Sequence, residues 1–278
     1  MKKLLFLLLF LPALVYSQQK PIAFWNQGFS ANAQQYFARY DTKPTGDTLK
    51  WYAEFIDSLT LNGVWAQIDE MWIYANSTQA NSLLGVKGYK NSAAVNTPTF
   101  TSYRGFAGNG STSYINTNYN PSSDKVSLTA NSMSIGAYSR TNTQSNKAIM
   151  GNLGASPNRY MYIYPWTNTG FFFYPINQTS DDFVASTTSL GFYAANRSDA
   201  SSIQAYRNGT QAGTASVAAS TINNVALYVC AINQNGTAAE FSTRQIAFAY
   251  VGASLTAQQQ LNLYNCLQRL MTKIGANV

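Results

Sequence analysis

Short runs of alternating hydrophobic and polar residues occupy most of the chain after residue 83. Successive side chains of a β-strand point to opposite faces of a sheet, so this period of two predicts strands. Turn residues separate the runs, and Asn208-Gly209 is the sharpest hairpin signal because both residues tolerate a positive φ. The predicted strands lie near residues 83–87, 112–117, 132–140, 147–152, 159–165, 170–175, 188–195, 202–207, 210–216, 224–232 and 243–252.

The two ends of the chain show helical spacing instead, with hydrophobic residues recurring every three or four positions. Near the C-terminus, Thr256 and Gln259 are spaced as a capping box, which marks the start of a helix. The predicted helices span residues 30–39, 48–61 and 257–274, whereas residues 64–75 fit a helix in their first half and a strand in their second.

Together these elements predict a mainly β fold, namely a two-sheet antiparallel jelly-roll sandwich with short N-terminal helices and a C-terminal helix. The N-terminal sequence MKKLLFLLLFLPALVYS combines basic residues, an apolar run and a cleavage region, which is typical of a secretory signal peptide. The alternative is an uncleaved hydrophobic tail, because the apolar run is too short to span a bilayer. The predicted domains are this signal or tail at residues 1–17, a helical attachment region at 18–82 and the jelly-roll domain at 83–278.

The composition limits the classes of partner and cofactor that the protein is expected to bind. Charged residues make up only 10% of the 278 residues, and the net charge of +7 comes from singly scattered lysines and arginines. Nucleic-acid-binding surfaces cluster their basic residues, so a nucleic-acid partner is excluded. The sequence has no histidine, so zinc and haem sites have almost no ligands to use. Cys230 and Cys266 either form a disulfide between sheet and helix or remain buried free thiols.

One stretch resembles a known family. The residues Gly105, Gly108, Asn109, Gly110, Ser111, Tyr114, Ile115, Asn116 and Thr117 match a motif of concanavalin A-like, laminin-G-like jelly-roll domains, especially those of phage tail and other virion proteins. Three later segments agree with these domains in order, at residues 132–140, 206–214 and 246–275. The resemblance covers roughly residues 83–275. It implies a two-sheet jelly roll with a binding or scaffolding role, and it names no ligand.

The acidic residues argue against catalysis and metal binding. Some relatives on this fold are glucanases with a Glu-x-Asp-x-x-Glu strand, which this sequence lacks, and no histidine is present to activate a serine. The chain is therefore predicted not to be an enzyme, and no acid pair is expected beside residues 159–174. Asp69 and Glu70 are expected at the surface, as are Glu54 and Asp57. Candidate calcium ligands are Asp124, Asp181 and Asp182, but such sparse acids do not favour a metal, and no cofactor is expected.

Residues 159–174 carry the candidate binding strand. Tyr160, Tyr162 and Tyr164 alternate with Met161 and Ile163, which places the tyrosines on the face opposite the core. Such a face suits a sugar or a protein partner, unless helices 48–61 and 257–274 cover it. Within it, the strand centre is expected to pack and the strand end to meet the ligand. The candidate ligand-binding residues are Trp166, Tyr164, Tyr138, Arg140, Asn142, Asn152 and Arg159.

The sequence thus predicts a non-catalytic binding module that recognises glycans or a surface partner. The first alternative is a structural subunit of a phage virion, such as a tail, fibre or head-decoration protein. The second alternative is an atypical glycoside hydrolase. The expected location is secreted or at the cell surface, or else in the virion. No membrane-spanning segment is expected in the mature chain, and homo-oligomerisation is left open.

Overall fold

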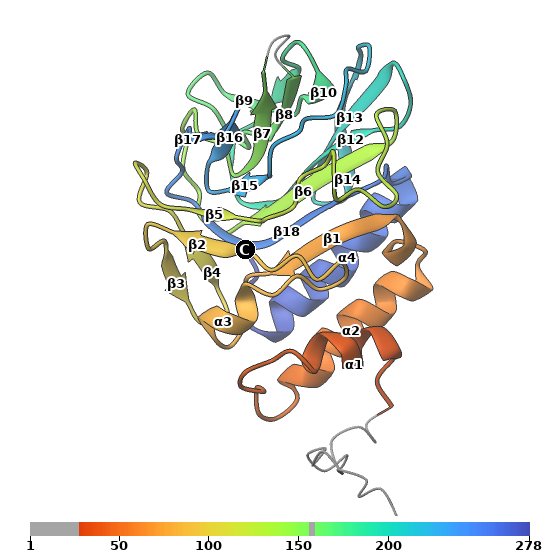
Figure 1. Cartoon of the computed structure of the whole chain (residues 1–278), viewed down its shortest axis with the longest axis vertical. Coiled ribbons are helices and arrows are strands. Elements are labelled where there is room, and N and C mark those ends of the chain that lie inside the picture. The colour runs from red at the N-terminus through yellow and green to blue at the C-terminus, as the bar shows by residue number, and fades with distance from the viewer. Residues whose placement is uncertain (1–27, 156–158) are drawn as a thin grey trace, which may run out of the picture.

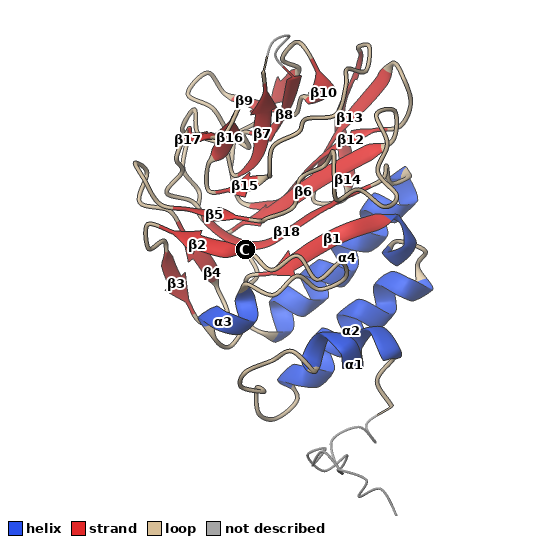
Figure 2. Cartoon of the chain, viewed as in Figure 1, coloured by secondary structure: helices blue, strands red, loops and turns tan. Residues whose placement is uncertain are grey.

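The computed structural model describes residues 28–155 and 159–278. Two β-sheets stack face to face, and helices cover the outer face of one of them, so the molecule has three layers (Figure 1, Figure 2). This confirms the predicted mainly β, two-sheet antiparallel sandwich with short N-terminal helices and a C-terminal helix. The prediction for residues 1–17 lies outside the described residues. Within the described part of the chain, no helix is both long and apolar enough to cross a membrane.

The sheet that carries the helices, here called the helix-side sheet, is organised around strand β18 (Gln245–Gly252). One edge of β18 pairs with β6 (Met133–Ser139), and its other edge pairs with β1 (Ile68–Ile73) and β4 (Gly105–Ala107), all antiparallel. The remaining strands are β12 (Gly191–Arg197), β13 (Ser202–Arg207) and β14 (Thr210–Ser216) beyond β6, and β3 (Thr99–Thr101) beyond β4.

The second sheet, here called the outer sheet, has β8 (Arg159–Ile163) and β7 (Met150–Gly154) side by side in antiparallel register. A separate two-stranded sheet of β9 (Phe171–Phe173) and β11 (Phe183–Ala185) joins the end of β8 through a bridge between Tyr164 and Phe173. The remaining strands of the outer sheet are β10 (Ile176–Gln178) beside β8, then β15 (Tyr228–Val229), β5 (Tyr114–Asn116) and β2 (Ala93–Val95) beyond β7. A side branch consists of β16 (Ile232–Gln234), which pairs with β7, and β17 (Thr237–Ala239), which pairs with β16.

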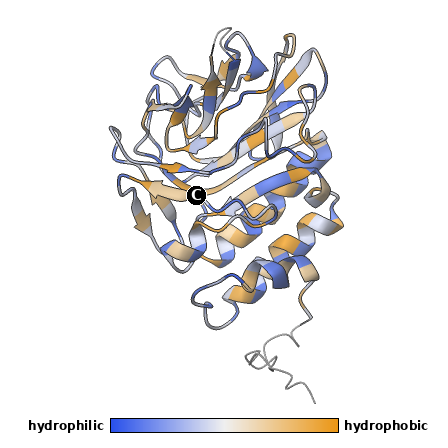
Figure 3. Cartoon of the chain, in the orientation of Figure 1, coloured by the Kyte–Doolittle hydropathy of each residue, from blue (hydrophilic) through white to orange (hydrophobic). Residues whose placement is uncertain are grey.

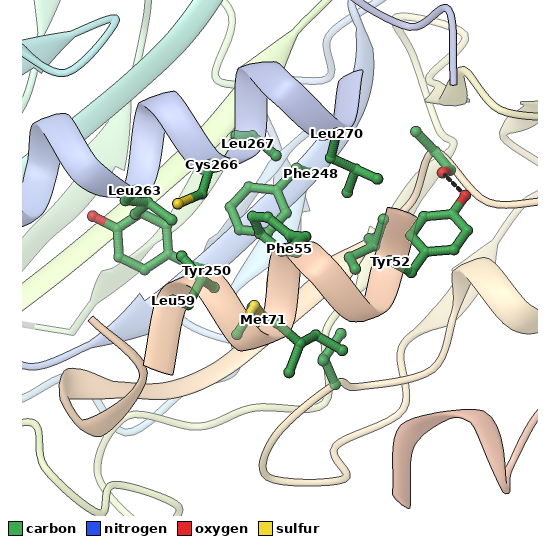
Figure 4. Packing of buried hydrophobic residues seen from close by; sticks show 14 of the residues in the cluster. Tyr52, Phe55, Leu59, Met71, Phe248, Tyr250, Leu263, Cys266, Leu267 and Leu270 are labelled. Carbon is green, nitrogen blue, oxygen red and sulfur yellow. Dashed lines mark hydrogen bonds between the residues drawn. The ribbon is translucent and has the colours of Figure 1, made fainter. Parts of the chain in front are cut away.

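Hydrophobic side chains fill two separate cores, one between the sheets and one between the helix-side sheet and the helices. In the second core, Phe55 meets Phe248 of β18 edge-on, with ring centroids 5.9 Å apart (Figure 4). Cys230 lies in the first core and Cys266 in the second, so they do not pair and both thiols are free. The covering helices are α1 (Ala31–Phe37), α2 (Thr48–Leu61) and α4 (Ala257–Lys273), and hydrophobic and hydrophilic residues alternate along α2 and α4 (Figure 3).

The chain begins α4 at the predicted capping box. The Thr256 hydroxyl accepts from the Gln259 backbone N–H at 3.2 Å, and the Gln259 side chain accepts from the Thr256 N–H at 3.0 Å. The predicted hairpin turn is also present, because Asn208 and Gly209 join β13 to β14 with φ values of 50° and 76°.

In the ambiguous segment 64–75, residues Ile68–Ile73 form strand β1, and its position contradicts two predictions. It pairs with β18 in the helix-side sheet, helices cover one of its faces, and residues 83–90 close its other edge, so all six of its residues are buried. Asp69 is only 3% exposed and Glu70 is 0% exposed, so their predicted place at the surface is wrong. Because β1 is hydrogen-bonded into the sandwich, residues 28–82 are part of the same folded unit as the rest of the described chain.

The predicted strand at 83–87 is replaced by a loop that follows the short helix α3 (Gln79–Ser82). This loop closes over the buried Glu70, whose carboxylate accepts hydrogen bonds from the backbone N–H groups of Lys87 at 2.9 Å and Lys90 at 2.7 Å. The loop is therefore held by the Glu70 side chain and also by the backbone of β1, since the Val86 N–H donates to the Met71 carbonyl oxygen at 2.9 Å and Trp72 forms a bridge with Gly85. The predicted strand at 224–232 divides into β15 and β16.

The glycine-rich segment at residues 105–117 forms β4, β5 and the turn between them. Gly105 has a φ of 101°, and a Cβ atom there would lie 2.0 Å from the carbonyl oxygen of Ile246 in β18. The side chain of Asn109 accepts hydrogen bonds from three following backbone N–H groups at 2.8–3.0 Å. Close strand packing and a stabilised loop therefore explain these residues without a ligand.

Candidate functional site

Strand β8 and the residue after it turn three tyrosines outward, away from the core between the sheets. Tyr160, Tyr162 and Tyr164 alternate with Met161 and Ile163, which are buried in that core. Helices α2 and α4 pack on the helix-side sheet instead, on the opposite side of the sandwich (Figure 1). The alternative in which these helices cover the tyrosines is therefore excluded.

A pocket of about 270 Å³ opens on this face, where the end of β8 meets β9 and the surrounding loops. We call it the tyrosine pocket. Its lining combines aromatic rings with hydroxyl, amide and carboxylate groups, which is the mixture expected of a small-molecule site. The lining residues are Asn146, Tyr162, Tyr164, Thr167, Thr169, Phe173, Asp181 and Glu240.

Aromatic rings form one continuous side of the tyrosine pocket. The rings of Tyr162 and Tyr164 lie perpendicular at 90° with centroids 4.8 Å apart, and Phe173 lies 6.3 Å beyond Tyr164. The backbones of Tyr164 and Phe173 exchange two hydrogen bonds of 3.0 and 3.1 Å, which hold the two residues side by side. Tyr162 is 7% exposed, so the outer part of the aromatic wall consists of Tyr164 and Phe173, which are only partly buried.

Two carboxylates reach the tyrosine pocket from loops far from β8 in the sequence. Tyr162 donates its hydroxyl hydrogen bond to Asp181, which lies between β10 and β11. Burial raises the pKa of Tyr162 and the contact with Asp181 raises it further, so this phenol remains a donor at neutral pH. Glu240 accepts a hydrogen bond of 3.1 Å from Lys147. Its backbone φ of 54° is uncommon for glutamate, and such strained residues cluster at functional sites.

Behind the pocket, buried Arg244 connects two of the loops that form it. Its guanidinium donates to the carbonyl oxygens of Thr143 at 2.6 Å and Lys147 at 2.8 Å on one loop, and of Trp166 at 3.1 Å on the other. Burial lowers the pKa of Arg244 to about 10, so the group is still a cation at neutral pH. The first loop carries Asn146, so Arg244 sets the position of part of the pocket lining.

Tyr164 is the one predicted site residue that lines the pocket. Trp166 lies two residues further along the same segment and is half-buried. Arg159 is at the opposite end of β8, where its guanidinium donates to the side chain of Asn223 at 3.2 Å. Asn152 of β7 is buried and accepts a hydrogen bond of 2.7 Å from the same Asn223. Arg159 and Asn152 therefore stabilise the far end of the outer sheet.

The other three predicted residues lie in or near the helix-side sheet. Tyr138 of β6 is covered by α4, and its hydroxyl donates to Gln268 at 2.9 Å. Arg140 donates to the carbonyl oxygen of Ala276 at 2.6 Å. Asn142 accepts hydrogen bonds from the loop before β12. The predicted residues thus do not form one face, because a period of two shows which side chains share a strand face but not which sheet the strand joins.

The pocket also contains residues that the sequence reasoning missed. Tyr162 packs as expected for the strand centre, since it is 7% exposed, and its ring also lines the pocket. Asp181 and Glu240 line the pocket together, so the expectation of no acid pair beside residues 159–174 is wrong. Their approach depends on loop folding, for which the sequence has no local signal. The remaining missed residues are Asn146, Thr167, Thr169 and Phe173.

The three candidate calcium ligands do not gather in one place. Asp124 forms an ion pair of 2.8 Å with Lys90. Asp181 accepts from Tyr162, and its neighbour Asp182 accepts from the side chain of Gln178. In the part of the chain that the structure describes, no group of three or more histidine, cysteine or acidic residues could hold a metal ion.

Comparison with known proteins finds similarity in structure only. No protein-family model matches the sequence, and no characterised protein matches it significantly. A Trypanosoma rangeli sialidase bound to 2,3-difluorosialic acid as a covalent intermediate superposes with a TM-score of 0.50 and 9% identity, over 78% of this chain and 39% of that one. The binding domain of botulinum neurotoxin serotype D superposes with a TM-score of 0.51 and 10% identity, over 72% of this chain and 52% of that one. The chain thus spans about two fifths to one half of these structures, and the likeness concerns the fold.

These comparisons contradict the prediction that the protein is not an enzyme, because the solved structures that share its fold include a sialidase trapped as a covalent intermediate. The missing Glu-x-Asp-x-x-Glu strand argues against one glucanase mechanism only, and the missing histidine argues against one way to activate a nucleophile. The structure adds a physical reason for the correction. Asp181 and Glu240 stand in one pocket although neither lies in a strand of the outer sheet.

Proposed function

We propose that the protein binds glycans in the tyrosine pocket. The single observation that carries this proposal is the aromatic wall of Tyr164 and Phe173 facing hydroxyl, amide and carboxylate groups in one open pocket. Aromatic rings stack on the apolar face of a sugar, and polar side chains bond its hydroxyls. The resemblance of residues 83–275 to concanavalin A-like domains supports the same reading, as does a fold shared with sialidase and toxin binding-domain structures.

The size of the pocket limits how much of a glycan it holds. Its volume of about 270 Å³ is close to the lower end of small-molecule sites, which is roughly 300 Å³. The pocket therefore suits the end of a glycan chain rather than an extended segment. Trp166 remains a candidate for further contact, since it follows Tyr164 on the same segment and is half-buried.

Replacing Tyr164 by alanine is expected to weaken glycan binding at least tenfold, since truncating a central aromatic anchor typically costs about 2 kcal/mol. A glycan array identifies the ligand, and calorimetric titration of the full chain then measures Kd for each variant. Tyr160→Ala is the matched control, because Tyr160 lies on the same face but does not line the pocket. Trp166→Ala tests the second predicted contact. Equal Kd values for Tyr164→Ala and the unaltered protein would show that the glycan binds elsewhere.

Glycoside hydrolysis is the second candidate function, and one observation favours it. Asp181 and Glu240 line the same pocket, and many glycosidases use two carboxylates beside the scissile bond. If this function is correct, the protein releases reducing ends from the glycan that it binds. Asp181→Asn or Glu240→Gln should then lower kcat by a factor of about 10² or more, while binding persists. A bound glycan that stays intact during long incubation with the protein would eliminate this candidate.

A further inference from the structure

The charged side chains that line the tyrosine pocket are acidic. Two of its lining residues, Asp181 and Glu240, are carboxylates, and none of the described residues that line it is a lysine or arginine. Lys147 is close, and its ammonium group forms an ion pair with Glu240 at 3.1 Å, which leaves Asp181 as the lining carboxylate without an ion pair among the described residues. Arg244 is 0% exposed behind the loops and directs its guanidinium at backbone carbonyl oxygens, so a ligand does not reach it.

The same two carboxylates give the pocket hydrogen-bond acceptors that need donors from a ligand. An ionised carboxylate only accepts hydrogen bonds, so Asp181 and Glu240 require donors from a ligand. Asp181 receives one donor from Tyr162, and Glu240 receives one from Lys147, which leaves acceptor positions on both carboxylates. Sugar hydroxyl groups supply such donors. A carboxylate or sulfate on the sugar supplies none and adds like-charge repulsion.

We infer that the tyrosine pocket selects uncharged sugars and excludes acidic ones such as sialic and uronic acids. This inference rests on the proposed glycan-binding function and names the ligand class of the same site. It also separates the chain from its structural neighbour, since the T. rangeli sialidase structures contain sialic acid or its difluoro derivative. The shared fold therefore does not carry that ligand preference to this pocket.

Sugars that differ only at C6 test the inference. Oligomers of glucose, galactose and mannose are compared with the matching oligomers of glucuronate, galacturonate and mannuronate, with the full chain in calorimetric titration. The neutral member of the pair that binds is expected to bind at least about tenfold tighter at low salt. The preference should decrease as salt is added, because the two carboxylates are partly solvent-exposed.

The variant Asp181→Asn/Glu240→Gln removes both charges and keeps the shape of the side chains, so the preference for the neutral sugar should fall to about onefold. An acidic sugar that binds the unaltered protein as tightly as its neutral partner would overturn the inference and leave glycan binding intact. A preference that persists unchanged in the double variant would overturn it as well. If no oligosaccharide on the array binds, the proposed function itself fails.

Discussion

Replacing Asp69 by alanine is expected to lower the free energy of unfolding by about 3 kcal/mol or more, because it leaves four hydrogen-bond donors, two of them buried, without their acceptor. The carboxylate is 3% exposed. It accepts hydrogen bonds from the backbone N–H groups of Val126 at 2.9 Å, Ser127 at 2.6 Å and Leu128 at 3.3 Å. It also accepts from the hydroxyl of Tyr119 at 2.8 Å. One side chain of β1 thus anchors the loop before β6.

Urea unfolding followed by tryptophan fluorescence measures this loss. Asp69→Asn should cost less than Asp69→Ala, since its amide oxygen still accepts hydrogen bonds, although its amino group then faces a backbone donor. Glu54→Gln is the control, because Glu54 forms ion pairs with Lys50 and Lys273 at the surface, where such pairs contribute about 0–1 kcal/mol. A similar small loss for Asp69→Ala and Glu54→Gln would mean that the carboxylate does not hold this loop.

The alternation of side chains predicted those parts of the structure that depend on a single element. It identified β8 correctly, with Met161 and Ile163 toward the core and the tyrosines on the other face. Helical spacing located α2 and α4, and the capping residues Thr256 and Gln259 marked the start of α4. These features are set by local geometry and by the need to bury one face, so the sequence shows them directly.

Features that depend on the assembly of distant segments could not be predicted in this way. Asp69 and Glu70 look like a polar pair on a surface strand, because acidic residues are rarely buried without partners. Their partners lie in loops that reach them only after folding. The tyrosine pocket has the same origin, since loops of no regular pattern bring Asp181 and Glu240 into the pocket that Tyr162 lines. Tyr138 is a second example. The pattern of its strand does not show that it lies under α4, because that position depends on which sheet the strand joins.

Replacing Arg244 by methionine is expected to lower the free energy of unfolding by about 3 kcal/mol or more and to weaken glycan binding in the same variant. Methionine fills much of the same space, so the loss comes mainly from the buried carbonyl groups that lose their donor. These carbonyls belong to Thr143, Ser145, Lys147 and Trp166. Their loops border the tyrosine pocket, so a loop that shifts moves part of the lining away from the ligand.

Arg159→Met is the matched control. Arg159 is partly exposed and donates to the side chains of Asn223 and Thr221, and water can take over these hydrogen bonds when the guanidinium is removed. It should cost less than about 1 kcal/mol and leave Kd unchanged, since it lies at the far end of β8. Binding by Arg244→Met is measured well below its melting temperature, where circular dichroism shows a native fold. A stable Arg244→Met variant with unchanged Kd would show that this arginine supports neither the loops nor the pocket. Lost stability with unchanged Kd would confine its role to the fold.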